Sequence, residues 1–196
     1  GLIEPMGRWI LQAACQQLAV WQGQFRDRSI KISINLSARQ LHEGLLRQLE
    51  DLLKGCCLYS EGLVLEITES MLVQNVEATC DLLERVRSKG IRLSIDDFGT
   101  GYSSLSYLHS FPFDVMKIDR SFVMQLLENP KSLEIVRNIL LLAQNLRLQT
   151  IAEGVETELQ LRQLGLLNCD FGQGYWFDRP LPAEEARKRI ERHLSS

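Results

Sequence analysis

The chain lacks cysteines at the spacing of a metal clip. The five cysteines include the adjacent pair Cys56 and Cys57, and no CxxC pattern occurs. Zinc ribbons and disulfide-stapled secreted domains depend on paired cysteines at regular spacing. We therefore expect reduced cysteines that act as small apolar residues, as in cytosolic proteins.

Long hydrophobic runs are also absent. The apolar run at 139–143 has five residues, far fewer than the about 20 that a membrane-spanning helix needs. No segment has the pattern of a signal peptide. The sequence therefore predicts no membrane segment in this chain and a cytoplasmic location, while a longer parent protein could carry a membrane anchor elsewhere.

Positive charge is not in excess. Lys and Arg number 22 against 25 Asp and Glu, which gives a formal net charge of −3. Proteins that bind DNA through its phosphates usually carry an excess of Lys and Arg, so we expect no DNA partner. A small phosphodiester ligand held through metal ions is compatible with this balance. At about 150 residues per domain, the 196 residues predict a single domain over 1–196.

Strand and helix patterns alternate along the whole chain. Alternating apolar segments predict strands at 30–36, 63–68, 91–96, 114–118, 149–153 and 170–177. Apolar residues at helical spacing predict helices at 5–25, 41–54, 75–89, 130–148, 156–164 and 183–193. Ser132 is the predicted N-cap of the fourth helix, and Gly55 and Gly90 are predicted stops.

This alternation indicates an α/β fold with a mostly parallel sheet. A doubly wound sheet would need no further strands. A βα barrel needs eight strands and typically about 250 residues, so the chain is short for a complete one. The pattern alone leaves both architectures open.

Polar side chains stand at or near the carboxyl ends of the predicted strands. In 30–36 and 91–96, apolar residues share one strand face, and polar residues share the other face, which ends in Asn35 and Asp96. Ligands in α/β folds bind just outside the carboxyl ends of parallel strands. The residues expected to converge there are Asn35, Glu66, Asp96, Asp97, Lys117, Asp119 and Glu153.

Five of these seven residues are carboxylates, which repel one another in one cleft unless cations lie between them. Oxygen ligands from Asp, Glu and Asn suit Mg²⁺, Mn²⁺ or Ca²⁺ rather than Zn²⁺. Two metal ions that clamp a phosphoryl group are a common use of such a cluster. A single acidic residue at a strand end is as often a helix cap or a solvated loop residue, so the prediction depends on the cluster.

Six strings carry a more specific signal: INLSARQL (34–41), LEITES (65–70), IDDFGTGYSSLSYL (95–108), KIDRSFV (117–123), IAEGVET (151–157) and QGYWFDRPL (173–181). In this order and spacing they closely resemble the EAL family of bacterial cyclic di-GMP phosphodiesterases. The resemblance covers most of the chain and implies a modified TIM-type βα barrel. It also implies hydrolysis of one 3′–5′ phosphodiester bond of cyclic di-GMP, which gives linear pGpG, by water bound to Mg²⁺ or Mn²⁺.

The resemblance assigns roles to matching positions. The positions that match the ligands of a two-metal site are Asn35, Glu66, Asp96, Asp97 and Glu153. Glu153 also matches the family's proposed general base, and Lys117 matches a residue that positions or helps to activate the water. Which of the two takes the proton stays open at this point.

Further matching positions lie around the substrate and the loop 97–106. Asp119 and Gln173 match positions on the substrate side. Glu69 and Glu156 match loop-anchoring or regulatory positions, and a buried hydrogen-bond bracket is compatible with the same role. By resemblance, Glu69 anchors the loop 97–106, which couples dimerisation to activity.

The Glu-Ala-Leu string that names the family does not occur in this chain. In the family it lies on an early strand, and its Glu is a metal ligand. The opening GLIEPMGRWIL resembles the helix after that strand, so we expect an N-terminally truncated domain with a barrel incomplete at that end. Unpaired edges, here on the strand 30–36, would make the piece alone prone to associate, and it would be weakly active or inactive.

The resemblance also implies partners. These are cyclic di-GMP, a second copy bound through the region 97–106, and a sensory or GGDEF-type domain upstream in the parent chain. Two other functions stay open: a receptor that binds cyclic di-GMP without cleaving it, and a regulatory domain that dimerises and modulates a neighbour. Nucleotide binding without turnover would separate the first of these from the second.

Overall fold

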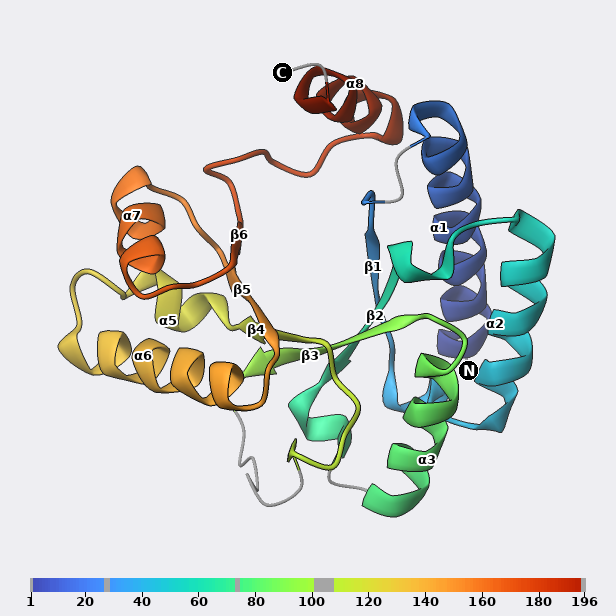
Figure 1. Ribbon diagram of the computed structural model, residues 1–196, viewed down its shortest axis with the longest axis horizontal. Coiled ribbons are helices and arrows are strands. Elements are labelled where there is room, and N and C mark those ends of the chain that lie inside the picture. Colours follow the sequence, from blue (N-terminus) through green and yellow to red (C-terminus); the bar gives the residue numbers. More distant parts are fainter. Residues whose placement is uncertain (1, 27–28, 73–74, 101–107, 195–196) are drawn as a thin grey trace. The chain divides into compact units, whose positions relative to one another are not determined.

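The computed structural model describes residues 2–26, 29–72, 75–100 and 108–194, over which helices and strands alternate (Figure 1). The strands are β1 (Ile32–Asn35), β2 (Leu63–Thr68), β3 (Arg92–Phe98), β4 (Val115–Ile118), β5 (Gln149–Glu153) and β6 (Phe171–Gln173). The helices are α1 (Ile3–Phe25), α2 (Glu43–Cys56), α3 (Val76–Arg87), α5 (Arg120–Met124), α6 (Pro130–Asn145), α7 (Glu158–Leu166) and α8 (Ala183–Leu194). Within the described ranges, no helix has both the length and the apolar character needed to cross a membrane.

Strands that follow one another in the chain are also hydrogen-bonded neighbours, in the order β1-β2-β3-β4-β5-β6. From β3 to β6 the pairing is parallel, with Lys117 opposite Ile151 and Glu153 opposite Gln173. A doubly wound sheet reverses its strand order at a switch point, and this order has none. The strand order is that of a βα barrel, with six strands among the described residues instead of eight.

The chain divides into two compact units. The first is drawn from Gly1–Leu65, Glu84–Arg92 and Pro180–Ser196, and the second from Glu66–Leu83 and Leu93–Arg179. In the first unit, α1 lies beside α2 and β1, and in the second, α5 and α6 pack against β5 (Figure 1). The single domain over 1–196 stays a prediction.

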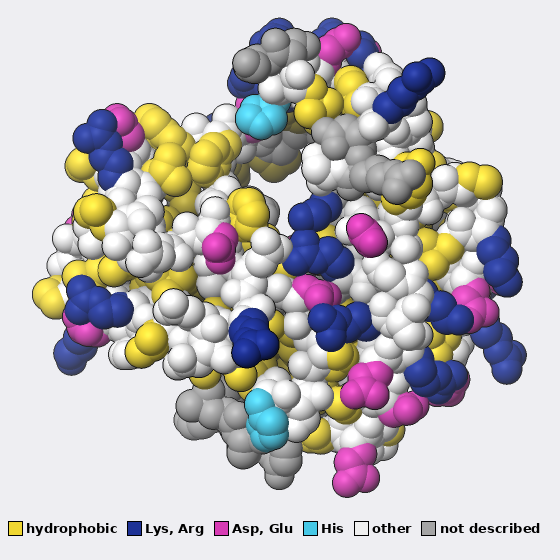
Figure 2. Space-filling view, viewed as in Figure 1, with side chains coloured by type: hydrophobic (Ala, Val, Ile, Leu, Met, Phe, Trp, Pro, Cys, Tyr) yellow, Lys and Arg dark blue, Asp and Glu magenta, His cyan; other side chains and the backbone are white. Residues whose placement is uncertain are grey.

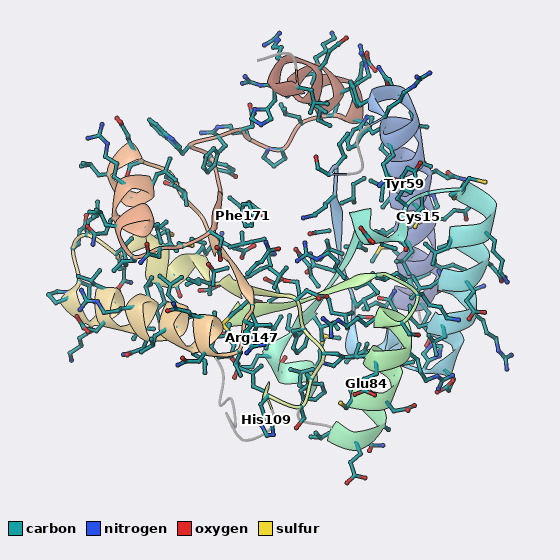
Figure 3. The ribbon with its side chains drawn as sticks, in the orientation of Figure 1. Cys15, Tyr59, Glu84, His109, Arg147 and Phe171 are labelled. Atoms are coloured by element: carbon teal, nitrogen blue, oxygen red, sulfur yellow. The ribbon has the colours of Figure 1, made fainter. Side chains whose placement is uncertain are left out.

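Cys15 behaves as a small apolar side chain. All five are free, and Cys15, marked on α1 in Figure 3, is fully buried. Burial raises the pKa of the Cys15 thiol to about 11, with a smaller contribution from Cys56. A thiol with such a pKa is protonated at neutral pH and packs as an apolar group.

Two predicted helix ends are wrong. The second helix does not stop at Gly55 but runs to Cys56, and Cys57 then takes up the left-handed conformation with a φ of 52°. The fourth predicted helix, α6, is capped by Asn129, whose side chain accepts from the Lys131 amide, and not by Ser132. Pro130 is the first helical residue, where its missing N–H costs nothing because that position has no intrahelical acceptor.

The last predicted strand, 170–177, is also too long. β6 ends at Gln173, after which the Trp176 amide donates to the Val155 carbonyl oxygen at 2.9 Å. This turn removes residues 175–177 from the sheet, although their aromatic side chains have high strand propensity. The terminal helix α8 has no buried residue, and charged side chains lie along it in Figure 2.

Two aspartates bind amide groups at the beginnings of neighbouring strands. Asp114 directly precedes β4, and its Oδ2 accepts from the Leu93 amide in β3 at 3.0 Å. Asp170 directly precedes β6, and its Oδ2 accepts from both the amide and the Oγ1 of Thr150 in β5, each at 2.8 Å. In both places, the carboxylate of the residue that precedes a strand thus accepts from an amide near the amino end of the neighbouring strand.

Replacing Asp170 with Ala should lower the free energy of unfolding. Thr150 is 3% exposed, so its amide and hydroxyl would lose their acceptor where water has little access. A buried unsatisfied donor costs about 1–2 kcal/mol, which urea unfolding of both proteins would measure. Asp170→Asn keeps an acceptor oxygen and should lose less, and an Asp170→Ala protein as stable as the original would contradict this role.

Candidate functional site

Carboxylates surround the ammonium group of Lys117 in the second unit. Lys117 Nζ lies 2.9 Å from Glu66 Oε2, 3.1 Å from Asp96 Oδ1 and 2.6 Å from Glu153 Oε1. The four residues belong to β2, β3, β4 and β5, so each strand supplies one member. Lys117 is 3% exposed and Glu66 5% exposed, and the network is therefore shielded from bulk water.

The strand period explains why these side chains meet. In β5, Thr150 and Ala152 are buried on one face, so Glu153 lies on the other with Ile151. Lys117 is opposite Ile151 in the parallel pairing, two positions before Glu153. The long lysine side chain spans this offset, and its ammonium reaches the carboxylate at the end of β5.

Charge and burial act against each other in this network. Burial lowers the pKa of Lys117, but the hydrogen bonds and charges of Glu153 and Glu66 outweigh it, so that this pKa lies above its usual value. Burial raises the pKa of Glu153, with Lys117 opposing the rise. Lys117 is therefore charged at neutral pH, while Glu153 binds a proton more tightly than an exposed glutamate does.

A second grouping of oxygens overlaps the first. Single carboxylate oxygens of Asp96, Asp97 and Glu153 all lie within 4.8 Å of one another. Burial raises the pKa of Asp97, and the negative charges of Asp96 and Asp119 raise it further. Such crowding of anionic oxygens fits a hard divalent cation such as Mg²⁺ or Mn²⁺, which oxygen ligands bind.

The backbone conformation at Asp97 brings the carboxylates of Asp96 and Asp97 close together. Asp97 has a φ of 53°, in the left-handed region that only a few per cent of non-glycine residues adopt. Its amide donates to Asp96 Oδ1 at 3.0 Å. Consecutive residues of a regular strand point to opposite faces, so this departure lets Asp97 bring its carboxylate near that of Asp96.

Asp119 and Glu69 flank the carboxylates. Asp119 caps α5, where its Oδ1 accepts from the amide of Ser121 at 2.9 Å and also from the Ser121 hydroxyl. Glu69 is 6% exposed, and its Oε2 accepts from the Gly99 amide at 3.2 Å. Glu69 thus fastens the beginning of the loop 97–106, of which residues 101–106 lie outside the described residues.

Three further predicted site residues are exposed at the ends of strands or in a turn. Asn35 is exposed at the end of β1 in the first unit. Gln173 is exposed at the end of β6, opposite Glu153 in the strand register. Glu156 is exposed in the turn after β5, and its amide donates to Gln160 Oε1 at 2.8 Å. Their predicted roles stay predictions.

Gln160 and Gly174 lie against the backbone that follows Glu153, and the sequence patterns did not indicate either residue. Gln160 Oε1 accepts from the amides of Glu156 and Thr157, and its Nε2 donates to the Val123 carbonyl oxygen at 3.3 Å. The spacing T-x-x-Q of a capping box could have indicated this residue. At Gly174, a Cβ would lie 2.3 Å from the Val155 carbonyl oxygen, a contact without a sequence signal.

A family model decides which proteins this chain is related to: the model described as the EAL domain matches residues 1–180. The chain belongs to the EAL domain family. Among its relatives, the signaling protein YkoW of Bacillus subtilis is 42% identical over 191 residues, which are 97% of this chain and 24% of YkoW. The cyclic di-GMP phosphodiesterase NbdA of Pseudomonas aeruginosa is 42% identical over 183 residues, 93% of this chain and 23% of NbdA. This EAL chain thus spans about a quarter of the length of these curated relatives.

A solved structure gives the same relationship. The PaMucR phosphodiesterase in its c-di-GMP complex superposes with a TM-score of 0.91 at 41% identity, covering 95% of this EAL chain and 75% of that one. This similarity confirms the predicted α/β fold of the modified TIM type. The six described strands of this EAL chain are part of such a barrel and fewer than the eight of a complete one.

Proposed function

We propose that this EAL domain hydrolyses cyclic di-GMP to linear pGpG in a reaction that depends on Mg²⁺ or Mn²⁺. The observation that carries this proposal is the contact of Lys117 with three carboxylates, those of Glu66, Asp96 and Glu153. The lysine and its three partners come from four neighbouring strands. NbdA is a cyclic di-GMP phosphodiesterase and the PaMucR phosphodiesterase is bound to c-di-GMP, which supports cyclic di-GMP as the substrate. A termination step in second-messenger signalling follows from this reaction.

We propose that two divalent ions bind to oxygen ligands of this chain. Asp96, Asp97 and Glu153 supply the closest oxygens, and Glu66 and Asn35 are the further ligands that we propose. Bound there, the ions would polarise the phosphoryl group and lower the pKa of a water molecule. Asp96 contacts both Lys117 and the Asp97 amide, which fixes its carboxylate in place.

The proton of the attacking water goes to Glu153 in this proposal. Without bound ions, the carboxylates of Glu153 and Glu66 raise the pKa of Lys117 despite its burial, so we assign the proton to Glu153 and not to the lysine. Burial raises the pKa of Glu153, which makes it a stronger base than an exposed glutamate. The 2.6 Å contact with Lys117 holds the Glu153 carboxylate in a fixed position.

The remaining roles follow the same proposal. Asp119 and Gln173 contact the substrate, and Glu69 and Glu156 anchor the loops beside the site. A homodimer forms through the region 97–106, and a sensory or GGDEF-type domain precedes this domain in the parent protein. The reaction takes place in the cytoplasm, where this signalling nucleotide acts.

Removing divalent ions should abolish turnover. Without cations, the closely spaced carboxylates of Asp96, Asp97 and Glu153 would repel the phosphates of the substrate. Conversion of cyclic di-GMP to pGpG, followed by chromatography, should stop after addition of a chelator and return when Mn²⁺ is added in excess. Turnover that continues undiminished in the chelator would contradict the metal dependence.

A receptor function is the second candidate, and one observation favours it. Lys117 contacts Glu66, Asp96 and Glu153, which the hydrolase would need as metal ligands. A site whose carboxylates stay paired with this lysine would bind the nucleotide and fail to cleave it. Calorimetric binding of cyclic di-GMP by the parent protein, in the absence of any pGpG, would establish the receptor and exclude the hydrolase.

A further inference from the structure

Two carboxylates of the site serve two purposes at once. Asp96 and Glu153 contact the ammonium of Lys117 at 3.1 and 2.6 Å. The same two residues, with Asp97, make up the oxygen grouping that fits a divalent cation. The buried ammonium of Lys117 therefore shares two carboxylates with the divalent ion that the proposed reaction requires.

The geometry of Lys117 makes this sharing competitive. An ammonium group has three N–H donors, and Lys117 has one carboxylate for each: Glu66, Asp96 and Glu153. Every donor is thus directed at an anionic oxygen. An oxygen lone pair that accepts from Lys117 is not available to a metal ion, and two cations at such short range also repel each other.

Burial strengthens this effect. Lys117 is 3% exposed and Asp96 7% exposed, so solvent screens their charges far less than it screens a surface pair. The ammonium charge therefore acts on Asp96 and Glu153 with little screening.

We propose that Lys117 limits the affinity of this site for divalent ions by competing with them for Asp96 and Glu153. The inference rests on the proposed metal-dependent function of the same site and adds a determinant of its metal occupancy. Lys117 also neutralises part of the carboxylate charge when no divalent ion is bound. Removal of the Lys117 charge should therefore have two effects. The site should bind the metal ion more tightly, and the protein should be less stable in a chelator.

The test is Mn²⁺ binding to the 196-residue chain, measured by calorimetry and by the electron paramagnetic resonance signal of free Mn²⁺. Lys117→Met keeps the apolar stem and removes the charge, and it should bind Mn²⁺ at least about tenfold more tightly. Lys117→Arg keeps the charge and should stay within about threefold of the original protein. Lys89→Met is the matched control, because Lys89 is half-exposed and pairs with Glu50, and it should leave Mn²⁺ binding unchanged.

Stability gives a second readout. Lys117→Met should unfold at a lower temperature than the original protein in a chelator and should gain more from saturating Mn²⁺. If it does not fold at all, Lys117→Gln is the second variant, because it removes the charge and keeps an N–H donor for a neighbouring carboxylate. This variant should also bind Mn²⁺ more tightly than the original protein, because Asp96 and Glu153 no longer contact an ammonium.

The outcomes separate this inference from the proposed function. Equal Mn²⁺ affinity of the original protein and the charge-removing variants would overturn the competition while leaving metal-dependent hydrolysis intact, and weaker binding by the variants would do the same. Absence of Mn²⁺ binding in all of the proteins would overturn both the competition and the metal dependence.

Discussion

Replacing Glu153 with Gln should lower the turnover of cyclic di-GMP by about 10³-fold. The amide keeps the size of the side chain but cannot take a proton from water, and it is a weaker ligand for a divalent ion. It also removes the negative charge that lies 2.6 Å from Lys117. Initial rates of pGpG formation at saturating substrate, with Mg²⁺ or Mn²⁺ present, measure the effect.

Glu158→Gln is the control for this variant. Glu158 lies on α7, is exposed and pairs with Arg162 at 2.6 Å, so its replacement should leave turnover unchanged. Nucleotide binding should survive in Glu153→Gln, because the loss affects the chemical step. A Glu153→Gln protein that retains most of its turnover would show that another group accepts the proton.

Replacing Gly174 with Ala should lower the free energy of unfolding by about 3 kcal/mol, near the upper range for an overpacked site. The added Cβ would lie 2.3 Å from the oxygen and 2.4 Å from the nitrogen of Val155. Both neighbours are backbone atoms, and both are engaged, since the Val155 amide donates to Gln173 and its carbonyl oxygen accepts from Trp176. Neither can move without breaking a hydrogen bond between the ends of β5 and β6.

Gly165→Ala provides the comparison on the same unit. A Cβ at Gly165 would meet nothing within 4 Å, and the residue lies within α7, where Ala has the higher helix propensity. This variant should be as stable as the original protein or slightly more stable. Urea unfolding of both variants tests the contrast, and equal stabilities of the two would contradict the close approach at Gly174.

The sequence predicts those parts of the fold that have a regular period. The apolar segment 63–68 and the alternating segment 149–153 predicted the bounds of β2 and β5, because a strand buried on both faces is apolar throughout and a strand buried on one face alternates. Helix ends were less predictable: Gly55 lies inside α2, since a glycine within a helix costs only about 1 kcal/mol, which packing of Leu45 and Leu49 offsets.

The sequence predicts which residues form the candidate site, but it does not predict which of them contact one another. Strand periodicity placed Glu66, Asp96 and Glu153 at carboxyl ends, but that all three contact Lys117 depends on the strand register and on the reach of a lysine. The left-handed backbone at Asp97 has no pattern in the sequence either. Long-range hydrogen bonds, such as that from Gln160 to Val123, form only when the chain has folded.

Hydrolysis of cyclic di-GMP by the parent protein in ¹⁸O-labelled water, with Mn²⁺ present, tests the central claim most directly. If its EAL domain cleaves one phosphodiester bond with water as the nucleophile, mass spectrometry should find pGpG with one ¹⁸O in its terminal phosphate. Cyclic di-GMP recovered unchanged and unlabelled, from a parent protein that binds it, would contradict the hydrolase and identify the protein as a receptor.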